Sequence, residues 1–136
     1  MNWQTRFVDT GYWVAFFHAG DNLHHRALAL ARRLRGPLVT TSIVLIEVAD
    51  GLASGSTRHL GTRFLERVRM DPNVTVVPLS PDLLDRSIAR YVTRSDKEWG
   101  LTDCISFVVM EERGITEALA YDQHFVQAGF RALLRE

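Results

Sequence analysis

Four acidic residues are spaced so that a folded chain can bring them together. Asp9 and Asp122 each follow a short apolar stretch. Asp103 lies in the first turn of an apolar helical segment, and Glu47 lies about one and a half turns into another. Carboxylates gathered in one cleft repel one another, and each raises the pKa of the others unless a cation neutralises them. The set therefore predicts a divalent ion with oxygen ligands, Mg²⁺ or Mn²⁺. Such an ion can polarise a phosphodiester and supply hydroxide from bound water.

Hydrophobic periodicity predicts the elements that must position these acids. Strands are expected within residues 3–10, 37–41, 73–79, 117–121 and 130–134. Helices are expected within residues 12–17, 23–36, 43–52, 58–70, 82–94, 101–114 and 122–129. Asp21 or Asn22, Ser42 and Thr102 are the expected N-caps of three of these helices. Pro81 is expected to open another helix.

The alternation of strands and helices predicts an α/β fold with a parallel sheet and helices on both faces. The 136 residues fit one domain with a sizeable core. In such a sheet Asp9 and Asp122 would lie at the carboxyl edge, where open α/β sheets bind ligands. Asp9 also belongs to an Asp-Thr-Gly tripeptide, as in aspartic proteases. Those enzymes are all-β, so the helices that follow Asp9 exclude that chemistry.

The composition excludes several classes of protein, but it does not indicate a binding partner. Sixteen basic residues balance sixteen acidic ones, so the overall charge does not steer the chain toward nucleic acid or membrane. Several arginines lie on predicted helices, where most are expected to form a solvated face with salt-bridge partners. Cys104 is the sole cysteine, which excludes an internal disulfide and a thiolate-rich metal site. No apolar run approaches about 18 residues, and we expect a soluble, cytoplasmic protein.

Each acidic residue also has a purely structural interpretation. Asp9 and Asp122 could cap the helices that follow them, and Asp103 could complement a helix dipole. Glu47 is harder to explain in this way because apolar residues flank it on both sides. Asp96 is expected to be a solvated loop acid. His124 could assist a proton transfer, although a place on a helix surface is the simpler interpretation.

Four successive blocks of the sequence resemble the PIN-domain family, and in particular its VapC toxins. The blocks are "FVDTGYWVAFF", "LVTTSIVLIEVADGL", "LTDCISFVVMEERGI" and "ALAYDQHFVQAGF". They occur in the family's order over almost the whole chain. The resemblance implies a three-layer α/β/α PIN-like fold with a central parallel sheet, formed by residues 1–136 as a single nuclease domain. It further implies a Mg²⁺- or Mn²⁺-dependent endoribonuclease in which water attacks an RNA phosphodiester.

On the family pattern, Asp9, Glu47 and Asp103 map to the acids that hold metal and orient water. Asp122 maps to the fourth acidic position, which binds the metal directly or through water. Thr10 matches a hydroxyl residue often found beside the first aspartate. The departures are Tyr121, Gln123 and His124, which stand where family members often have Thr or Asn before the last aspartate and a second acid after it. These departures put a second metal ion in doubt.

The resemblance also implies partners, namely an RNA substrate, a cognate antitoxin and a second copy of the chain in a homodimer. The apolar helix 44–52 and the Gly-Ser break after it could offer an exposed groove. The main alternative is a catalytically silent PIN-like module that binds RNA or protein. A phosphatase would need Asp-x-Asp after the first strand, and a receiver domain a further acidic pair and a lysine. The stretch after Val8 provides neither.

Overall fold

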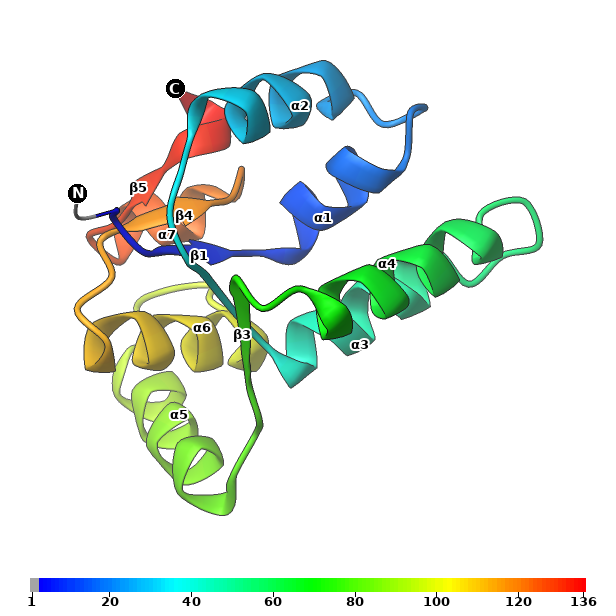
Figure 1. Cartoon of the computed structure of the whole chain (residues 1–136). Helices are drawn as coiled ribbons and strands as arrows, with labels where there is room; N and C mark the ends of the chain where they lie inside the picture. Colours follow the sequence, from blue (N-terminus) through cyan, green and yellow to red (C-terminus); the bar gives the residue numbers. More distant parts are fainter. Residues whose placement is uncertain (1–2) are drawn as a thin grey trace.

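Five short strands and seven α-helices alternate along the chain, as a computed structural model of residues 3–136 shows (Figure 1). The strands are β1 (Arg6–Val8), β2 (Leu38–Thr41), β3 (Val74–Val77), β4 (Glu117–Leu119) and β5 (Arg131–Ala132). The helices are α1 (Thr10–Phe17), α2 (His24–Arg33), α3 (Ser42–Gly51), α4 (Arg58–Met70), α5 (Pro81–Thr93), α6 (Leu101–Glu112) and α7 (Gln123–Gln127). A 3₁₀ turn, Leu133–Arg135, ends the chain. None of these helices is long and apolar enough to span a membrane.

All strand pairs are parallel, and the strand order is β3-β2-β1-β4-β5. The chain moves outward from β1 to β3 through α1–α4 and then crosses back to β4 and β5 through α5–α7. Right-handed crossovers in opposite directions place the two groups of helices on opposite faces of the sheet. The result is the predicted three-layer α/β/α architecture (Figure 1). The direction of the connections reverses between β1 and β4, so the carboxyl ends of these strands flank a crevice.

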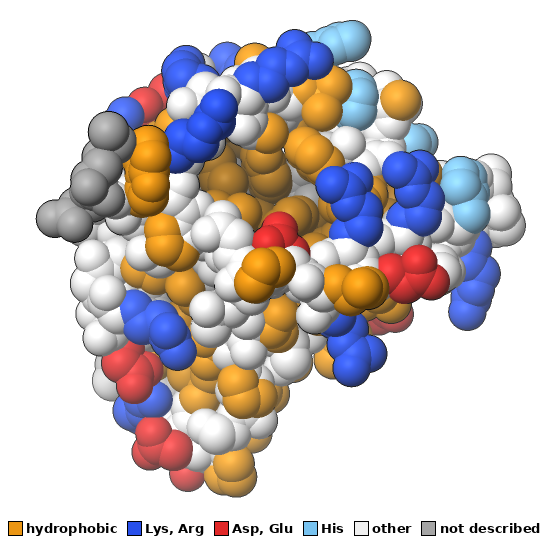
Figure 2. All heavy atoms as spheres, viewed as in Figure 1, with side chains coloured by type: hydrophobic (Ala, Val, Ile, Leu, Met, Phe, Trp, Pro, Cys, Tyr) orange, Lys and Arg blue, Asp and Glu red, His pale blue; other side chains and the backbone are white. Residues whose placement is uncertain are grey.

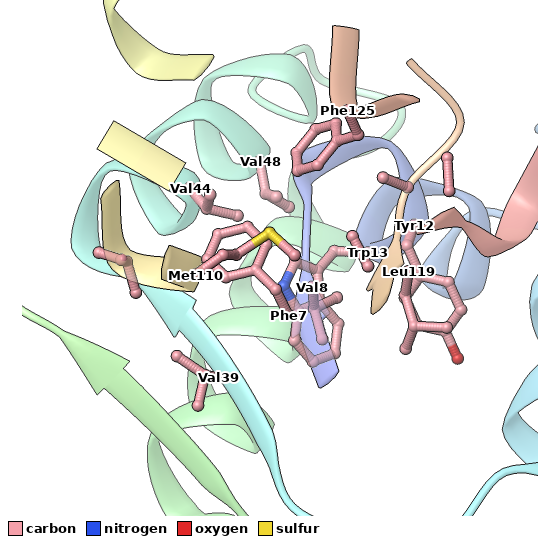
Figure 3. Packing of buried hydrophobic residues seen from close by; sticks show 14 of the residues in the cluster. Phe7, Val8, Tyr12, Trp13, Val39, Val44, Val48, Met110, Leu119 and Phe125 are labelled. Carbon is pink, nitrogen blue, oxygen red and sulfur yellow. The ribbon is translucent and has the colours of Figure 1, made fainter. Parts of the chain in front are cut away.

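The hydrophobic core surrounds β1, the central strand. Phe7 and Val8 are fully buried and, as successive strand residues, point to opposite faces of the sheet. The Phe7 ring packs near Phe125 of α7, with 6.3 Å between ring centroids. Figure 3 shows side chains from both helical layers, such as Val48 and Met110, gathered around these two residues. Because β1 is held from both sides, the residue that follows it has a fixed position.

Three expected N-caps were wrong by one or two residues. Thr41 caps α3 by accepting a hydrogen bond from the Val44 N–H (3.1 Å), whereas the Ser42 hydroxyl accepts one from the Leu79 N–H (3.1 Å). Gly100 is the N-cap of α6, so Thr102 lies inside the helix. The Asp21 carboxylate accepts from the Leu23 N–H in the turn before α2 and does not cap the helix itself. Neighbouring hydroxyl and carboxyl residues can each serve as the N-cap of a helix, and only tertiary contacts decide which of them does so.

The expectation of an exposed groove along residues 44–52 was also wrong. Val44, Leu45, Val48 and Leu52 are buried, because α3 packs between α1 and α4. Ile46 is the exposed large apolar residue of this helix. An apolar hollow exists elsewhere, between α1, α2 and α4, and Figure 2 shows its hydrophobic floor with arginine side chains at the rim.

Candidate metal centre

The four predicted acids line one cavity at the carboxyl edge of the sheet. This cavity has a volume of about 330 Å³. Its lining residues are Asp9, Thr10, Glu47, Thr102, Asp103 and Asp122. They come from the end of β1, the start of α1, the middle of α3, the first turn of α6 and the loop after β4. Segments far apart in the sequence thus bring their acidic side chains to the crevice beside β1 and β4.

Asp9 directly follows the central strand β1. Its N–H donates to the Leu119 carbonyl of β4 (3.1 Å), which continues the β1–β4 pairing past the end of the strand. Asp9 is the N-cap residue of α1, but its side chain makes no capping hydrogen bond. The structural interpretation of Asp9 as a helix cap therefore does not explain its carboxylate.

Glu47 is brought to the cavity by the packing of α3 against α1. Its Oε1 accepts a hydrogen bond of 2.8 Å from the Thr10 hydroxyl. Thr10 is the first residue of α1, directly after Asp9, so one short segment supplies an acid and also orients a second one. Val44, Leu45 and Val48 bury the rest of the helix, which leaves Glu47 turned into the crevice and not into solvent.

Asp103 and Asp122 meet at the other side of the cavity through His124. Asp103 Oδ2 accepts from the Gly100 N–H (3.0 Å) and lies 2.9 Å from His124 Nδ1. Asp122 caps α7 by accepting from the His124 N–H (2.9 Å), and its Oδ1 is 3.4 Å from His124 Nδ1. The structural interpretations of Asp103 and Asp122 are thus confirmed, yet each carboxylate still faces the cavity. A carboxylate has two oxygens, so the same side chain can cap a helix and also contribute an oxygen to the acidic cluster.

The electrostatics of the cavity favour a bound cation. Burial raises the pKa of Asp9 from its ordinary value of 3.8 to about 7, and the negative charges of Asp103, Glu47 and Asp122 add to this rise. The Thr10 backbone N–H offsets part of it. No lysine or arginine is among the described residues that line the cavity. Oxygen donors with no cationic neighbour are the ligand set that Mg²⁺ or Mn²⁺ prefers, so the residues present fit such an ion.

Two residues near these acids were not predicted to belong to the site, although a role in proton transfer was considered for His124. Thr102 lines the cavity, although it was expected only as a helix cap. His124 lies beside the acids, because one of its ring nitrogens and one oxygen each of Asp103 and Asp122 lie within 4.8 Å of one another. The available signal was their proximity in sequence to Asp103 and Asp122. Asp96 stays outside the site, as expected, and pairs with Arg94 (3.0 Å) in an exposed loop.

Comparison with known proteins agrees with this architecture. The family model of the PIN domain matches residues 6–131. The 23S rRNA-specific endonuclease VapC20 of Mycobacterium tuberculosis is 32% identical over 124 residues, which cover 91% of this chain and 94% of VapC20.

Solved structures show the same fold. The crystal structure of Mycobacterium tuberculosis VapC20, described as a sarcin-ricin loop cleaving toxin, aligns with a TM-score of 0.84 and 30% identity. That alignment covers 91% of this chain and 95% of VapC20. VapBC2 from Rickettsia felis aligns with a TM-score of 0.66 at 11% identity, over 95% of this chain and 97% of that one. The family model over residues 6–131 and the likeness to VapC20 over nearly its full length establish that the chain belongs to the PIN-domain family, among its VapC-like proteins.

Proposed function

We propose that the protein is a divalent-metal-dependent endoribonuclease and the toxin of a toxin-antitoxin pair. The observation that carries this proposal is the convergence of four acidic side chains, from four separate segments, on one cavity without a basic neighbour. A purely structural set of helix caps would not need to meet in one place. Membership of the VapC-like proteins supports RNA as the substrate.

The ligands of the ion are assigned to Asp9, Glu47, Asp103 and Asp122. When bound, the ion would polarise a phosphodiester and lower the pKa of a bound water. Thr10 holds Glu47 through its 2.8 Å hydrogen bond, and the Gly100 N–H holds Asp103 at the start of α6. These contacts fix the carboxylates before substrate arrives, so little reorganisation is needed during the reaction.

Ribosomal RNA is the first substrate to test, because the relative VapC20 is a 23S rRNA-specific endonuclease. The purified chain is incubated with 23S rRNA and with a mixed pool of structured RNAs, in Mg²⁺ and separately in Mn²⁺. EDTA and the Asp103→Asn variant serve as controls. Cleavage that both controls abolish would support the proposal, and mapped cut sites would define the substrate.

The opposite result would also be informative. If the wild type cuts no RNA and calorimetry detects no uptake of either ion, the proposal fails and a silent RNA- or protein-binding module takes its place. Retained cutting in Asp103→Asn, with the same products, would instead show that a contaminating nuclease or another site is responsible.

An antitoxin is proposed as the protein partner, and the hollow between α1, α2 and α4 is where its apolar segment would fit. This hollow has a volume of about 360 Å³ and is mainly apolar. Arg35 and Arg67 contribute to its lining, as does Trp13, whose buried Nε1 has no hydrogen-bond partner among the described residues. A segment with apolar side chains, acidic residues and a free carbonyl would complement it. Co-purification with the product of an adjacent short reading frame, abolished by Arg67→Glu, is the expected result.

Three further expectations complete the proposal. A homodimer is supported by exposed large side chains at helical spacing on α5, namely Ile88, Tyr91 and Val92. Light scattering of the purified chain is expected to give twice the mass of 15.5 kDa, and light scattering of Tyr91→Glu is expected to give the mass of one copy.

Residues 1–136 are proposed to form one nuclease domain, and the single contiguous hydrophobic core supports this proposal. The cytoplasm, where RNA substrates are found, is the proposed location.

A further inference from the structure

We propose that His124 is itself a ligand of the divalent ion, through Nδ1, and that it makes the site favour transition-metal ions such as Mn²⁺ over Mg²⁺. This inference rests on the proposed metal dependence and adds a nitrogen donor beside the carboxylates of Asp103 and Asp122. His124 follows Asp122 by two residues, on the first turn of α7.

The position of His124 is fixed by its neighbours in α7. Phe125 is fully buried, and its ring packs against Phe107 of α6, with 5.1 Å between centroids. The His124 N–H donates to Asp122, which caps the same helix. An anchored backbone on both sides of His124 holds the imidazole beside the carboxylates of Asp103 and Asp122. Its side chain is only 21% exposed, whereas that of Asp122 is 44% exposed.

The distances around Nδ1 suit ligands that share one ion. Nδ1 lies 2.9 Å from Asp103 Oδ2 and 3.4 Å from Asp122 Oδ1. One ring nitrogen of His124 and one carboxylate oxygen from each aspartate lie within 4.8 Å of one another. With metal-ligand bonds of about 2.1 Å, adjacent ligands of an octahedral ion are roughly 3 Å apart. A ring with its proton on Nε2 would turn the Nδ1 lone pair to such an ion. A ring with its proton on Nδ1 would instead donate a hydrogen bond to Asp103, which is the competing arrangement.

A nitrogen donor changes which ion the site prefers. Both ions take mainly oxygen ligands, but Mg²⁺ is the harder ion and keeps several waters, whereas Mn²⁺ is a transition-metal ion and accepts an imidazole nitrogen more readily. The other proposed ligands in the cavity are carboxylates, so the preference would depend on His124 alone. Removing the imidazole is therefore expected to weaken Mn²⁺ binding strongly and Mg²⁺ binding little.

The test measures metal binding without RNA. Mn²⁺ is titrated into the metal-free full chain and followed by electron paramagnetic resonance, and Mg²⁺ affinity is obtained by competition. Pulsed measurements on the bound Mn²⁺ detect the hyperfine coupling of a coordinated nitrogen. The variants are His124→Gln and His124→Asn, and the matched control is His25→Gln, which changes an exposed histidine on α2. Melting curves establish that each variant is folded. Two His124 variants are made so that the test can still be carried out if one of them fails to fold.

We expect nitrogen coupling in the wild type and in His25→Gln, and none in the His124 variants. Mn²⁺ affinity should fall on the order of tenfold in these variants, with less than about a twofold change for Mg²⁺. Bound Mn²⁺ with oxygen ligands only, or equal losses for both ions, would show that His124 merely positions Asp103. That result would overturn the inference and leave the proposed nuclease intact, whereas a wild type that binds no Mn²⁺ would overturn both.

Discussion

Replacing Asp9 by Asn should stabilise the metal-free protein at alkaline pH. The folded chain holds the Asp9 carboxyl with a pKa of about 7, well above its ordinary value of 3.8. A carboxyl whose pKa is raised by folding stabilises the protein fully below pH 3.8, and this stability is lost as the pH rises through 7. Asn has no proton to lose, so the variant escapes the penalty of a buried charge among three other carboxylates.

The magnitude follows from the two pKa values. At about 1.36 kcal/mol per pH unit, the difference between 3.8 and about 7 corresponds to roughly 4 kcal/mol in total. Between pH 5 and pH 8.5 the same relation gives a loss of about 3 kcal/mol for the wild type. Partial solvent access to Asp9 makes this an upper value.

Urea unfolding in EDTA at several pH values between 5 and 8.5 measures this difference. The free energy of unfolding of Asp9→Asn minus that of the wild type should grow with pH by up to about 3 kcal/mol. Asp85→Asn removes an exposed carboxylate that makes no hydrogen bond among the described residues, and it is the control for the loss of one charge. A difference that stays constant across the pH range would refute the assigned burial and repulsion. Saturating Mn²⁺ should shrink the difference, because the ion stabilises the ionised cluster.

Three further changes test other contacts. Thr10→Val, which removes the hydrogen bond to Glu47, should lower RNA cleavage about tenfold in initial-rate assays, whereas Thr10→Ser keeps the hydroxyl and most of the rate. Thr41→Val removes the cap of α3 and should cost about 1 kcal/mol in urea unfolding; no change would contradict the cap. Glu117→Gln should cost about 3 kcal/mol by the same method, because it leaves the half-buried Arg6 without its counter-ion. Calorimetry should show unchanged metal affinity in this last variant, since Glu117 lies at the opposite end of the sheet.

Much of the fold was predictable because its signals are local. Gly36-Pro37 ends the helical pattern of α2, and the helices after Pro81 and after Gly100 begin within a residue of their expected positions. The parallel arrangement of the strands follows from the alternation of strands and helices, with right-handed connections between the strands. With that topology, the placement of Asp9 and Asp122 at one edge of the sheet followed from their positions directly after strands.

Other features depended on contacts between distant segments. The burial of α3 could not be read from residues 44–52 alone, because it depends on α1 and α4 packing on either side. Likewise, helical periodicity did not reveal whether Glu47 faced solvent, and the Thr10 hydroxyl, 37 residues away, lies beside it only in the folded chain.

The sequence by itself determined which acids are available and on which edge of the sheet two of them lie. Only the tertiary structure decided which other atoms join them. His124 and Thr102 carry no acidic signature, and their roles depend on the docking of α7 beside the start of α6 through the buried Phe125 and Phe107 rings. Packing between elements is a non-local property, because the burial of a side chain is set by whichever segments cover it. The type of a residue therefore limits the chemistry that its side chain can perform. The contacts between distant segments determine which side chains come together to perform it.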